Sequence, residues 1–204
     1  MRGARNPPMH AELDRLREKL EMDLRAMFFA GGKEALRTEP VIAAYRSYYK
    51  GFRKTYHIEL QLESVIWKDR RIPSRGALVQ AMAMAELKNR LLTAGHDLAR
   101  VGLPVRIDTA TGSESYVGMG GEETVLKPGD MMIADAKGII SSIICGPDNR
   151  TAMGPDTKDI LFTVYAPAGI GVERVRSHLE DIQRFVQLVA PDAAMEELEA
   201  FSAD

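Results

Sequence analysis

The sequence predicts an α+β fold with some α/β character, in which helices cover a central sheet that is mainly antiparallel or mixed. Two observations favour this fold. Apolar residues at helical spacing occupy both ends of the chain, whereas residues 105–167 consist of short apolar runs divided by Gly-, Pro- and Asp-rich turns. The chain has 204 residues, of which 45% are hydrophobic, and this is enough for one substantial core. We therefore expect a single domain, with residues 1–38 as an N-terminal helical extension and residues 39–204 as its body.

Four helices are expected in the N-terminal half of the chain. They span residues 10–30, 40–50, 56–68 and 75–93. The first is predicted by a single apolar stripe, and the second by Pro40, which suits a first helical turn, with Thr38 as its cap. The third has mixed helix and strand spacing and is interpreted as a helix. The fourth is rich in strong helix formers and follows Ser74, which is its expected cap.

The centre of the chain is expected to form strands, and the C-terminal region is expected to form a pair of helices. The strands span residues 105–107, 115–117, 123–126, 131–134, 139–145 and 160–166. Turns at residues 118–121, 127–130 and 136–138 contain the glycine and proline that tight reversals favour. Alternating three- and four-residue apolar steps predict a helix over residues 172–189, and a short acidic helix is expected at residues 194–201.

Composition excludes several classes of protein. The net charge of −2 gives no overall positive field, so a nucleic acid would have to bind a local patch. One cysteine argues against disulfides, and no apolar stretch approaches the roughly 20 residues of a membrane span. No signal-peptide pattern opens the chain, so a cytoplasmic protein is expected. The histidines and the cysteine lack metal-ligand spacing, and we expect neither a metal nor a cofactor.

Short pieces of the second half carry a family resemblance. The pieces are Asn89 to Leu92, His96 to Leu98, Val105-Arg106, Ala110 with Gly112 and Glu114, Leu126 with Asp130, Ile133 to Asp135, Ile144 to Arg150 and Thr157 to Thr163. Their order and spacing resemble the tRNA-editing domain of the beta subunit of phenylalanyl-tRNA synthetase, over residues 78–191. The resemblance implies an α/β-type core, an editing-like domain over residues 39–204, and kinship with free-standing relatives of that domain.

The loop over residues 146–151 is the first candidate site, because polar groups follow a strand that is apolar except for two serines. Backbone amides near Gly146 could receive an ester or carboxylate oxygen, Asn149 could orient a substrate, and Arg150 could pair with an anion. The resemblance adds Thr151 to this substrate-binding set and implies that Asn89 reaches in from its helix. An ordinary β-turn with solvated side chains is the alternative.

Two residues with reactive side chains lie near this loop or within the matched region. His96 could act as a general base or contact an ester, or it could simply cap carbonyls at a helix end beside Asp97. Cys145 has no activating neighbour in the sequence and is interpreted as a small buried hydrophobe. The candidate catalytic residues are therefore Asn89, His96 and Asn149. The family's Gly-x-Met-Gly-Gly loop is absent here, and Ala94 stands where the family has histidine.

A second candidate site is the segment from Tyr45 to Tyr56, in which aromatic residues alternate with cations. Stacking faces beside cations are typical of single-stranded RNA binding. The candidate RNA-binding residues are Tyr45, Arg46, Tyr49, Lys50 and Arg53. In the alternative interpretation, the tyrosines pack in the core and the cations lie in water.

The leading hypothesis is a stand-alone domain that binds tRNA or the 3′ end of aminoacyl-tRNA and hydrolyses mischarged aminoacyl-tRNA in trans, with a water molecule oriented by the site. The alternative is a non-catalytic module that binds RNA or an amino-acid-like ligand in the same place. A third role, homodimer formation, is open to the stripe of the N-terminal helix.

Overall fold

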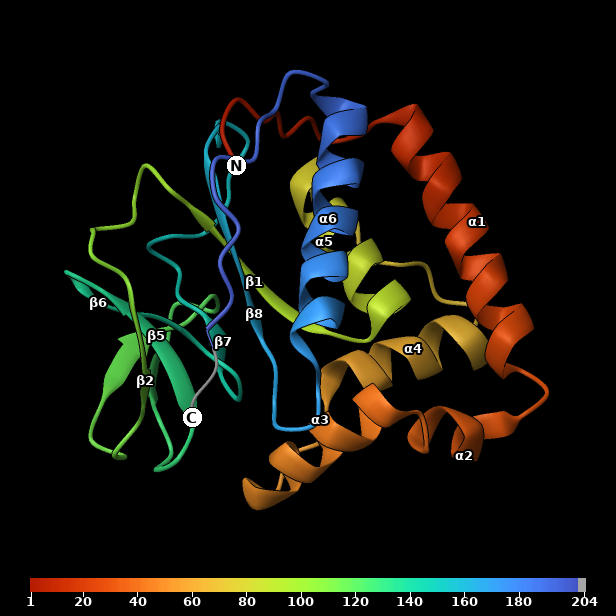
Figure 1. The fold of residues 1–204 in the computed structure, drawn as a ribbon, viewed down its shortest axis with the longest axis horizontal. Helices are drawn as coiled ribbons and strands as arrows, with labels where there is room; N and C mark the ends of the chain where they lie inside the picture. The colour runs from red at the N-terminus through yellow and green to blue at the C-terminus, as the bar shows by residue number, and fades with distance from the viewer. Residues whose placement is uncertain (202–204) are drawn as a thin grey trace.

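Residues 1–201 are described by the computed structural model, which is an α+β fold of helices and antiparallel sheets (Figure 1). The helices are α1 (Ala11–Phe28), α2 (Gly32–Arg37), α3 (Pro40–Gly51), α4 (His57–Trp67), α5 (Ala77–Asn89) and α6 (Val172–Val189). The strands are β1 (Leu92–Asp97), β2 (Arg106–Thr109), β3 (Ser115–Val117), β4 (Glu123–Val125), β5 (Met131–Asp135), β6 (Gly138–Ser142), β7 (Gly146–Pro147) and β8 (Ile160–Tyr165). The predicted fold class and the single domain are thus confirmed.

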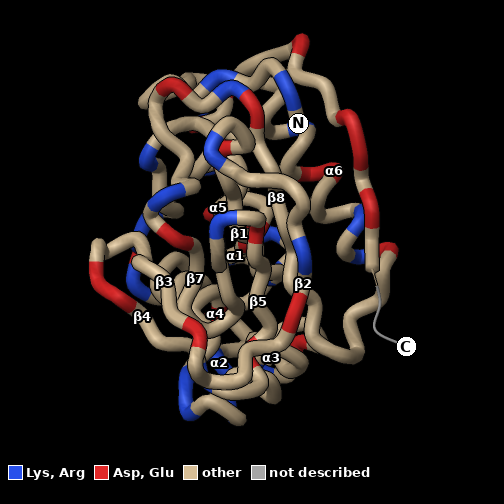
Figure 2. Tube along the Cα trace, turned by 90° about the vertical axis from the view of Figure 1, so that its left-hand side faces the viewer, with Lys and Arg blue, Asp and Glu red and all other residues tan. Residues whose placement is uncertain are grey.

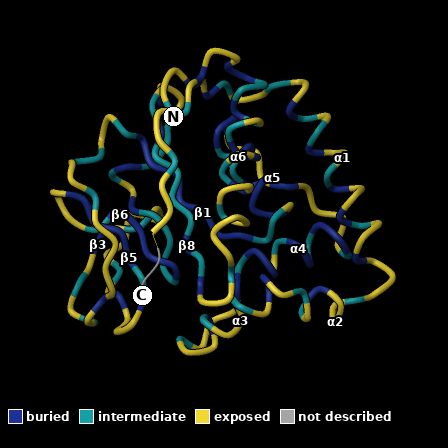
Figure 3. The backbone as a smooth tube through the Cα atoms, in the orientation of Figure 1, coloured by how far each residue is buried: buried dark blue, intermediate teal, exposed yellow. Residues whose placement is uncertain are grey.

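The strands form three antiparallel sheets. β1 pairs with β8, β3 pairs with β4, and the largest sheet has the order β2-β5-β6-β7. Figure 1 shows the β1–β8 pair between the helices on one side and the largest sheet on the other. All residues of β1 are buried, which is visible as dark blue in Figure 3. β1 therefore has one face toward helices and one toward the sheet that carries the candidate loop.

The N-terminal residues pack into the same molecule as the rest. Arg2 and Ala194 exchange backbone hydrogen bonds of 2.9 and 3.0 Å, and the amide of Ala4 donates to the carbonyl of Lys158 at 2.8 Å. Leu13 and Leu24 of α1 are buried in the main core. Residues 1–38 therefore contribute directly to the hydrophobic core that the remainder of the chain builds.

The structure corrects the predicted start of α3 and adds a helix before it. The carboxylate of Glu39 accepts from the amides of Val41 and Ile42, so Glu39 and not Thr38 caps α3. Thr38 instead follows the short helix α2, where its hydroxyl donates to the carbonyl of Glu34. The missed helix α2 has only six residues, too few to show a helical period.

The helix predicted over residues 75–93 ends earlier than expected. Arg90 adopts a left-handed conformation with φ 62°, and this ends α5 at Asn89. The chain then enters β1, so the prediction of helix at residues 92 and 93 is wrong. Ser74 does not cap α5 either, because its hydroxyl donates to the side chain of Gln80.

Two further elements differ from the prediction. The expected strand over residues 139–145 ends at Ser142, and a turn separates it from the short strand β7. The acidic helix expected at residues 194–201 is absent, and Ala194 forms a β-bridge with Arg2 instead. Within residues 1–201 no helix is both long enough and apolar enough to cross a bilayer.

Candidate functional site

The loop after β7 is held on both sides by backbone hydrogen bonds. The amide of Asp148 donates to the carbonyl of Ile140 in β6 at 2.8 Å, and the amide of Asn149 donates to the carbonyl of Val117 in β3 at 3.0 Å. Gly146 is the first residue of the loop and has φ 80°, a conformation that glycine adopts without strain. The loop over residues 146–151 therefore has a defined conformation at the junction of two sheets.

His96 lies beneath this loop and connects it to the core. Thr151 donates its only hydroxyl proton to Asp148, so it must accept from Nδ1 of His96, which lies 2.7 Å away. Nε2 of His96 is then free to accept from the hydroxyl of Ser141 at 3.3 Å. Ser141 in turn accepts from the hydroxyl of Tyr165. Each neighbouring pair of these groups thus shares one hydrogen-bonding proton. The resulting chain of hydrogen bonds runs from Tyr165 through Ser141, His96 and Thr151 to Asp148.

This chain has a chemical consequence for His96. Burial, and next the charge of Arg150, lower the pKa of His96 to about 4, so the ring is neutral at physiological pH with its proton on Nδ1. The ring is fully buried and contacts no solvent. Its place in β1 also shows that the expected helix-end position is wrong.

Arg150 is anchored by a bidentate ion pair. Two of its guanidinium nitrogens lie 2.9 and 3.0 Å from the carboxylate oxygens of Asp135 in β5, and it also donates to the carbonyl of Arg100 at 3.1 Å. Burial acts to raise the pKa of Asp135, but hydrogen bonds from Arg150 and from the amides of Gly102 and Lys137 bring it to about 2. Arg150 therefore holds the loop to β5.

Asn149 is the exposed side chain of the loop, and among residues 1–201 it makes no side-chain hydrogen bond. The residues on either side of it are anchored by Asp135, His96 and Ser141 through the contacts described above. The arrangement presents one free amide, with two donor hydrogens and an acceptor oxygen, from a fixed backbone.

Asn89 lies on the other side of β1. Its amide nitrogen is 2.9 Å from the carboxylate of Asp181 and 3.2 Å from Nδ1 of His178, both in α6. Thr93 of β1 contacts the same imidazole at 2.6 Å. Successive strand residues point to opposite faces, so Thr93 and His96 face opposite ways. The structure thus brings His96, Asn149, Arg150 and Thr151 together near Gly146 and leaves Asn89 on the helix side.

The tyrosines of α3 belong to the core. Tyr45 and Tyr49 are buried, and the ring of Tyr45 stacks on Tyr56 with 4.2 Å between centroids. The hydroxyl of Tyr45 donates to the carbonyl of Tyr165 and accepts from the amide of Leu92 at 3.0 Å. Neither buried ring offers a face to an RNA base in this structure, which agrees with the alternative interpretation of core packing.

The candidate cations of α3 differ in their contacts. Arg46 forms an ion pair with the buried carboxylate of Glu59 at 2.7 Å. Lys50 and Arg53 are exposed and form no ion pair with another residue of the described chain. The surface available to a polyanion is therefore the end of α3 and not its middle.

Sequence reasoning missed the residues that hold the loop in place. Asp135, Ser141 and Tyr165 are distant from the loop in sequence, and no local pattern connects them to it. Ser141 and Ser142 did interrupt an otherwise apolar strand, and buried polar residues usually have a hydrogen-bond partner. That signal could have pointed to a partner such as His96.

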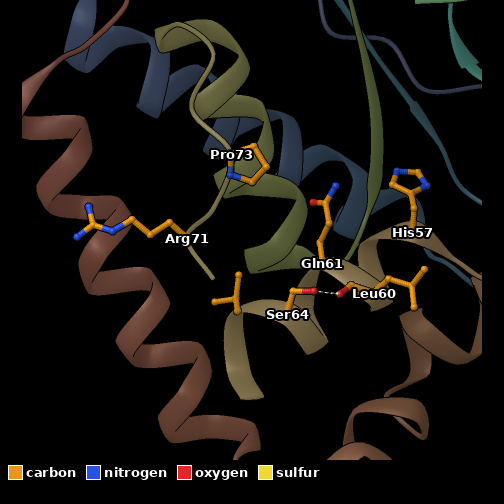
Figure 4. A pocket seen from close by; sticks show the side chains of 7 residues that line it. His57, Leu60, Gln61, Ser64, Arg71 and Pro73 are labelled. Atoms are coloured by element: carbon orange, nitrogen blue, oxygen red, sulfur yellow. Dashed lines mark hydrogen bonds between the residues drawn. The ribbon is translucent and has the colours of Figure 1, made fainter. Parts of the chain in front are cut away.

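Two surface pockets lie elsewhere. One has a volume of about 370 Å³ between α4 and residues 71–73, and its lining includes His57, Gln61 and Arg71 (Figure 4). The other, of about 280 Å³, lies between α1 and residues 69–71. Neither is lined by residues 146–151. Among the described residues, no group of His, Cys, Asp and Glu side chains is arranged to hold a metal ion.

Comparison with known proteins agrees with an α+β domain related to a tRNA synthetase. Residues 44–202 match the B3/4 domain, and the chain belongs to this family. A stretch of 69 residues is 33% identical to the phenylalanine–tRNA ligase beta subunit of Mycoplasma genitalium, and it covers 34% of this chain and 9% of that protein. The chain thus spans only a small part of that relative.

A solved structure shares the fold. It is an N-terminal fragment of the phenylalanyl-tRNA synthetase beta subunit from Pyrococcus horikoshii, with a TM-score of 0.50 and 17% sequence identity. The match covers 58% of this chain and 42% of that one. The match of residues 44–202 to the B3/4 domain confirms the resemblance seen in the sequence at the level of the family.

Proposed function

We propose that this B3/4 domain binds the acylated 3′ end of a tRNA at the loop over residues 146–151 and hydrolyses mischarged aminoacyl-tRNA in trans, in the cytoplasm. Membership of the family and the tRNA ligases among its relatives support the substrate class. The observation that carries the proposal is the exposed amide of Asn149, which stands on a loop fixed by backbone hydrogen bonds, an ion pair and a buried histidine.

The chemistry assigned to the site is ester hydrolysis. A water molecule attacks the ester carbonyl carbon, the bond from that carbon to the ribose oxygen breaks, and the proton released by the water passes to the departing ribose oxygen. The amide nitrogen of Asn149 is suited to donate a hydrogen bond to the developing oxyanion. Gly146 leaves room for the ester beside the backbone.

The remaining site residues are assigned to positioning. Arg150 uses its donors on Asp135 and Arg100, and Thr151 uses its hydroxyl between Asp148 and His96. His96 therefore acts through Thr151 and not on the substrate. Asn89, on the other face of β1, is assigned to holding α5 against α6.

The test is deacylation of a panel of mischarged tRNAs by the purified protein. Loss of one oxyanion donor typically costs a factor of about 10² to 10³ in rate, and this is the loss expected for Asn149→Ala. Asp156→Ala removes an exposed side chain from the same connection and should leave the rate unchanged. A wild-type rate no greater than spontaneous hydrolysis for every amino acid tested would refute the hydrolytic activity.

The second candidate function is a non-catalytic module that binds RNA or an amino-acid-like ligand. It is favoured by the burial of His96, which removes the nearest histidine from contact with a substrate. Binding measurements separate the two functions. In a binding module, Asn149→Ala lowers affinity for aminoacyl-tRNA and no turnover is seen in either protein, whereas in a hydrolase the variant loses turnover at saturating substrate.

A further inference from the structure

We propose that the C-terminal end of α3 and the neighbouring turn form a binding surface for the phosphate backbone of RNA, which leads to the loop over residues 146–151. We call it the α3-end surface, and it consists of Lys50, Arg53, Lys54 and Lys127. The inference rests on the proposed function, because the RNA held there is the stem whose 3′ end reaches the loop.

The backbone at the end of α3 is fixed by its own hydrogen bonds. The amide of Lys54 donates to the carbonyl of Tyr49 and that of Arg53 to the carbonyl of Lys50, both at 3.1 Å. This pattern closes the helix with Arg53 in the left-handed region, at φ 56°. Glycine is the usual residue at such a position, so the sequence keeps a cation where a smaller residue would be less strained.

Lys127 joins this helix end from another part of the chain. Its ammonium group donates to the carbonyl of Phe52 at 3.1 Å. Residues that are distant in sequence thus place positive charge at one point. The tube of Figure 2 shows Lys and Arg at the lower tip of the molecule, where α3 ends in Figure 1.

The cations of the α3-end surface have no acidic partners. All four are exposed, and within residues 1–201 none forms an ion pair with a carboxylate. Arg37 and Arg46, by contrast, both pair with Glu59. Unpaired and exposed cations are free to exchange their counterions for phosphates.

Below the α3-end surface, Asp130 connects the turn of Lys127 to the segment that precedes the candidate loop. The carboxylate of this buried residue accepts from the hydroxyl of Tyr48 in α3 at 3.1 Å and from the amide of Ile144 at 3.3 Å. The turn that carries Lys127 and the segment that leads into Gly146 therefore meet at one side chain. Burial raises the pKa of Cys145, and the charges of Lys54 and Lys127 act on this thiol in the opposite direction, as expected for cations close to it.

Cations at a helix C-terminus also stabilise the helix by interacting with its dipole. A control must therefore separate this effect from the binding of RNA. The test variant is Lys54→Gln with Lys127→Gln. The control is Lys68→Gln with Lys158→Gln, which removes the same charge from exposed residues, one of them at the end of α4. Binding of deacylated tRNA is measured as a function of salt concentration. Each lost phosphate contact should reduce the slope of log Kd against log salt by about 1, so the test variant should lose about 2 and the control none.

The outcomes separate this inference from the proposed function. Equal slopes for the test variant, the control and the wild type would overturn the α3-end surface, even if Asn149→Ala still abolished deacylation. A lower slope in the test variant alone supports the surface, even if no hydrolysis is seen. Binding of polyglutamate with the affinity of tRNA and the same dependence on Lys54 and Lys127 would identify an acidic protein as the partner and overturn the assignment to RNA. Melting temperatures of both variants should lie within about 2 °C of the wild type.

Discussion

At the scale of single residues, the neutral state of His96 is the feature on which the loop depends. Each hydroxyl in the chain from Tyr165 to Asp148 donates one proton in the same direction, and this leaves a single tautomer for the imidazole. Nitrogen-15 NMR of the ring should show a proton on Nδ1 and no titration between pH 5 and pH 8, because burial lowers the pKa to about 4. A midpoint near the ordinary value of 6.5 would contradict the described chain.

The ion pair of Arg150 makes a second prediction at this scale. Lysine keeps the charge but cannot form the two parallel hydrogen bonds that the guanidinium gives to Asp135. We expect Arg150→Lys to lower the free energy of unfolding by about 1 to 2 kcal/mol, since a charged hydrogen bond to a buried carboxylate is lost. Urea denaturation measures this. Arg106→Lys, at an exposed position in β2, serves as the control and should be neutral.

At the scale of elements, the end of α3 combines strain with a cation. The left-handed conformation of Arg53 costs about 1 to 2 kcal/mol for a residue with a side chain. Removal of this cost outweighs the few tenths of a kcal/mol that an exposed cation adds at a helix end. Arg53→Gly should therefore stabilise the protein by about 0.5 to 1 kcal/mol.

The matched control for that prediction is the next residue. Lys54 does not have a positive φ, so Lys54→Gly gains nothing from glycine's freedom and should destabilise the protein. Thermal unfolding of both variants compares them directly. A melting temperature that falls equally in both would show that the conformation of Arg53 is not strained.

Much of the order of elements could be predicted from the sequence, because periodicity and turn residues are local. The stripe of α6 and the turns at residues 118–121 and 136–138 are examples. The boundary between α5 and β1 could not be predicted from the sequence, because Leu91 and Leu92 suit a helix as well as a strand. Its position depends on the left-handed Arg90 and on pairing with β8, which is far away in the sequence.

The candidate loop could be predicted in the same limited way. Polar residues after an apolar strand marked residues 146–151, but their anchors come from β1, β5 and β6. The face on which Asn89 lies was likewise not visible, since it depends on where α5 ends. The buried state of Tyr45 and Tyr49 follows from tertiary packing of α3, which helical spacing alone does not distinguish from a solvent-facing aromatic stripe.

At the scale of the whole molecule, buried titratable groups on several elements have opposite effects on how the free energy of unfolding changes with pH. Burial lowers the pKa of His57 and of His178 to about 4, as it does for His96. Burial raises the pKa of Glu86 to about 8, although the amide of Thr93 donates to its carboxyl group. The free energy of unfolding must therefore depend on pH in two different ways.

The signs follow from proton binding in the two states. Between about pH 4 and pH 6.5 the unfolded chain binds protons at histidines that are neutral in the folded protein, so these groups contribute stability above pH 6.5 that is lost as the pH falls through 4. Between pH 4.5 and about pH 8 Glu86 keeps a proton in the folded protein that the unfolded chain has released, so its contribution is lost as the pH rises. The histidines outnumber Glu86 below pH 6.5. Above it Glu86 has the larger effect, and the N-terminal amino group, whose pKa is lowered by burial, opposes that effect in part.

Stability should therefore be greatest near pH 6.5 and should fall toward pH 8 by at most about 2 kcal/mol. Glu86→Gln keeps an oxygen that can accept from the amide of Thr93 but cannot ionise, so it should abolish the fall above pH 6.5 and make the rise in stability between pH 4.5 and pH 6.5 steeper. Glu114→Gln is the control. The pKa of Glu114 is lowered to about 2 by hydrogen bonds from Thr111 and Gly112, so its carboxylate contributes the same stability at every pH above about 4.5. Its replacement should therefore lower stability equally between pH 5 and pH 8 and leave the pH dependence in that range unchanged. Urea denaturation of the three proteins between pH 5 and pH 8 measures these effects, and a fall above pH 6.5 that persists in Glu86→Gln would show that another buried group carries it.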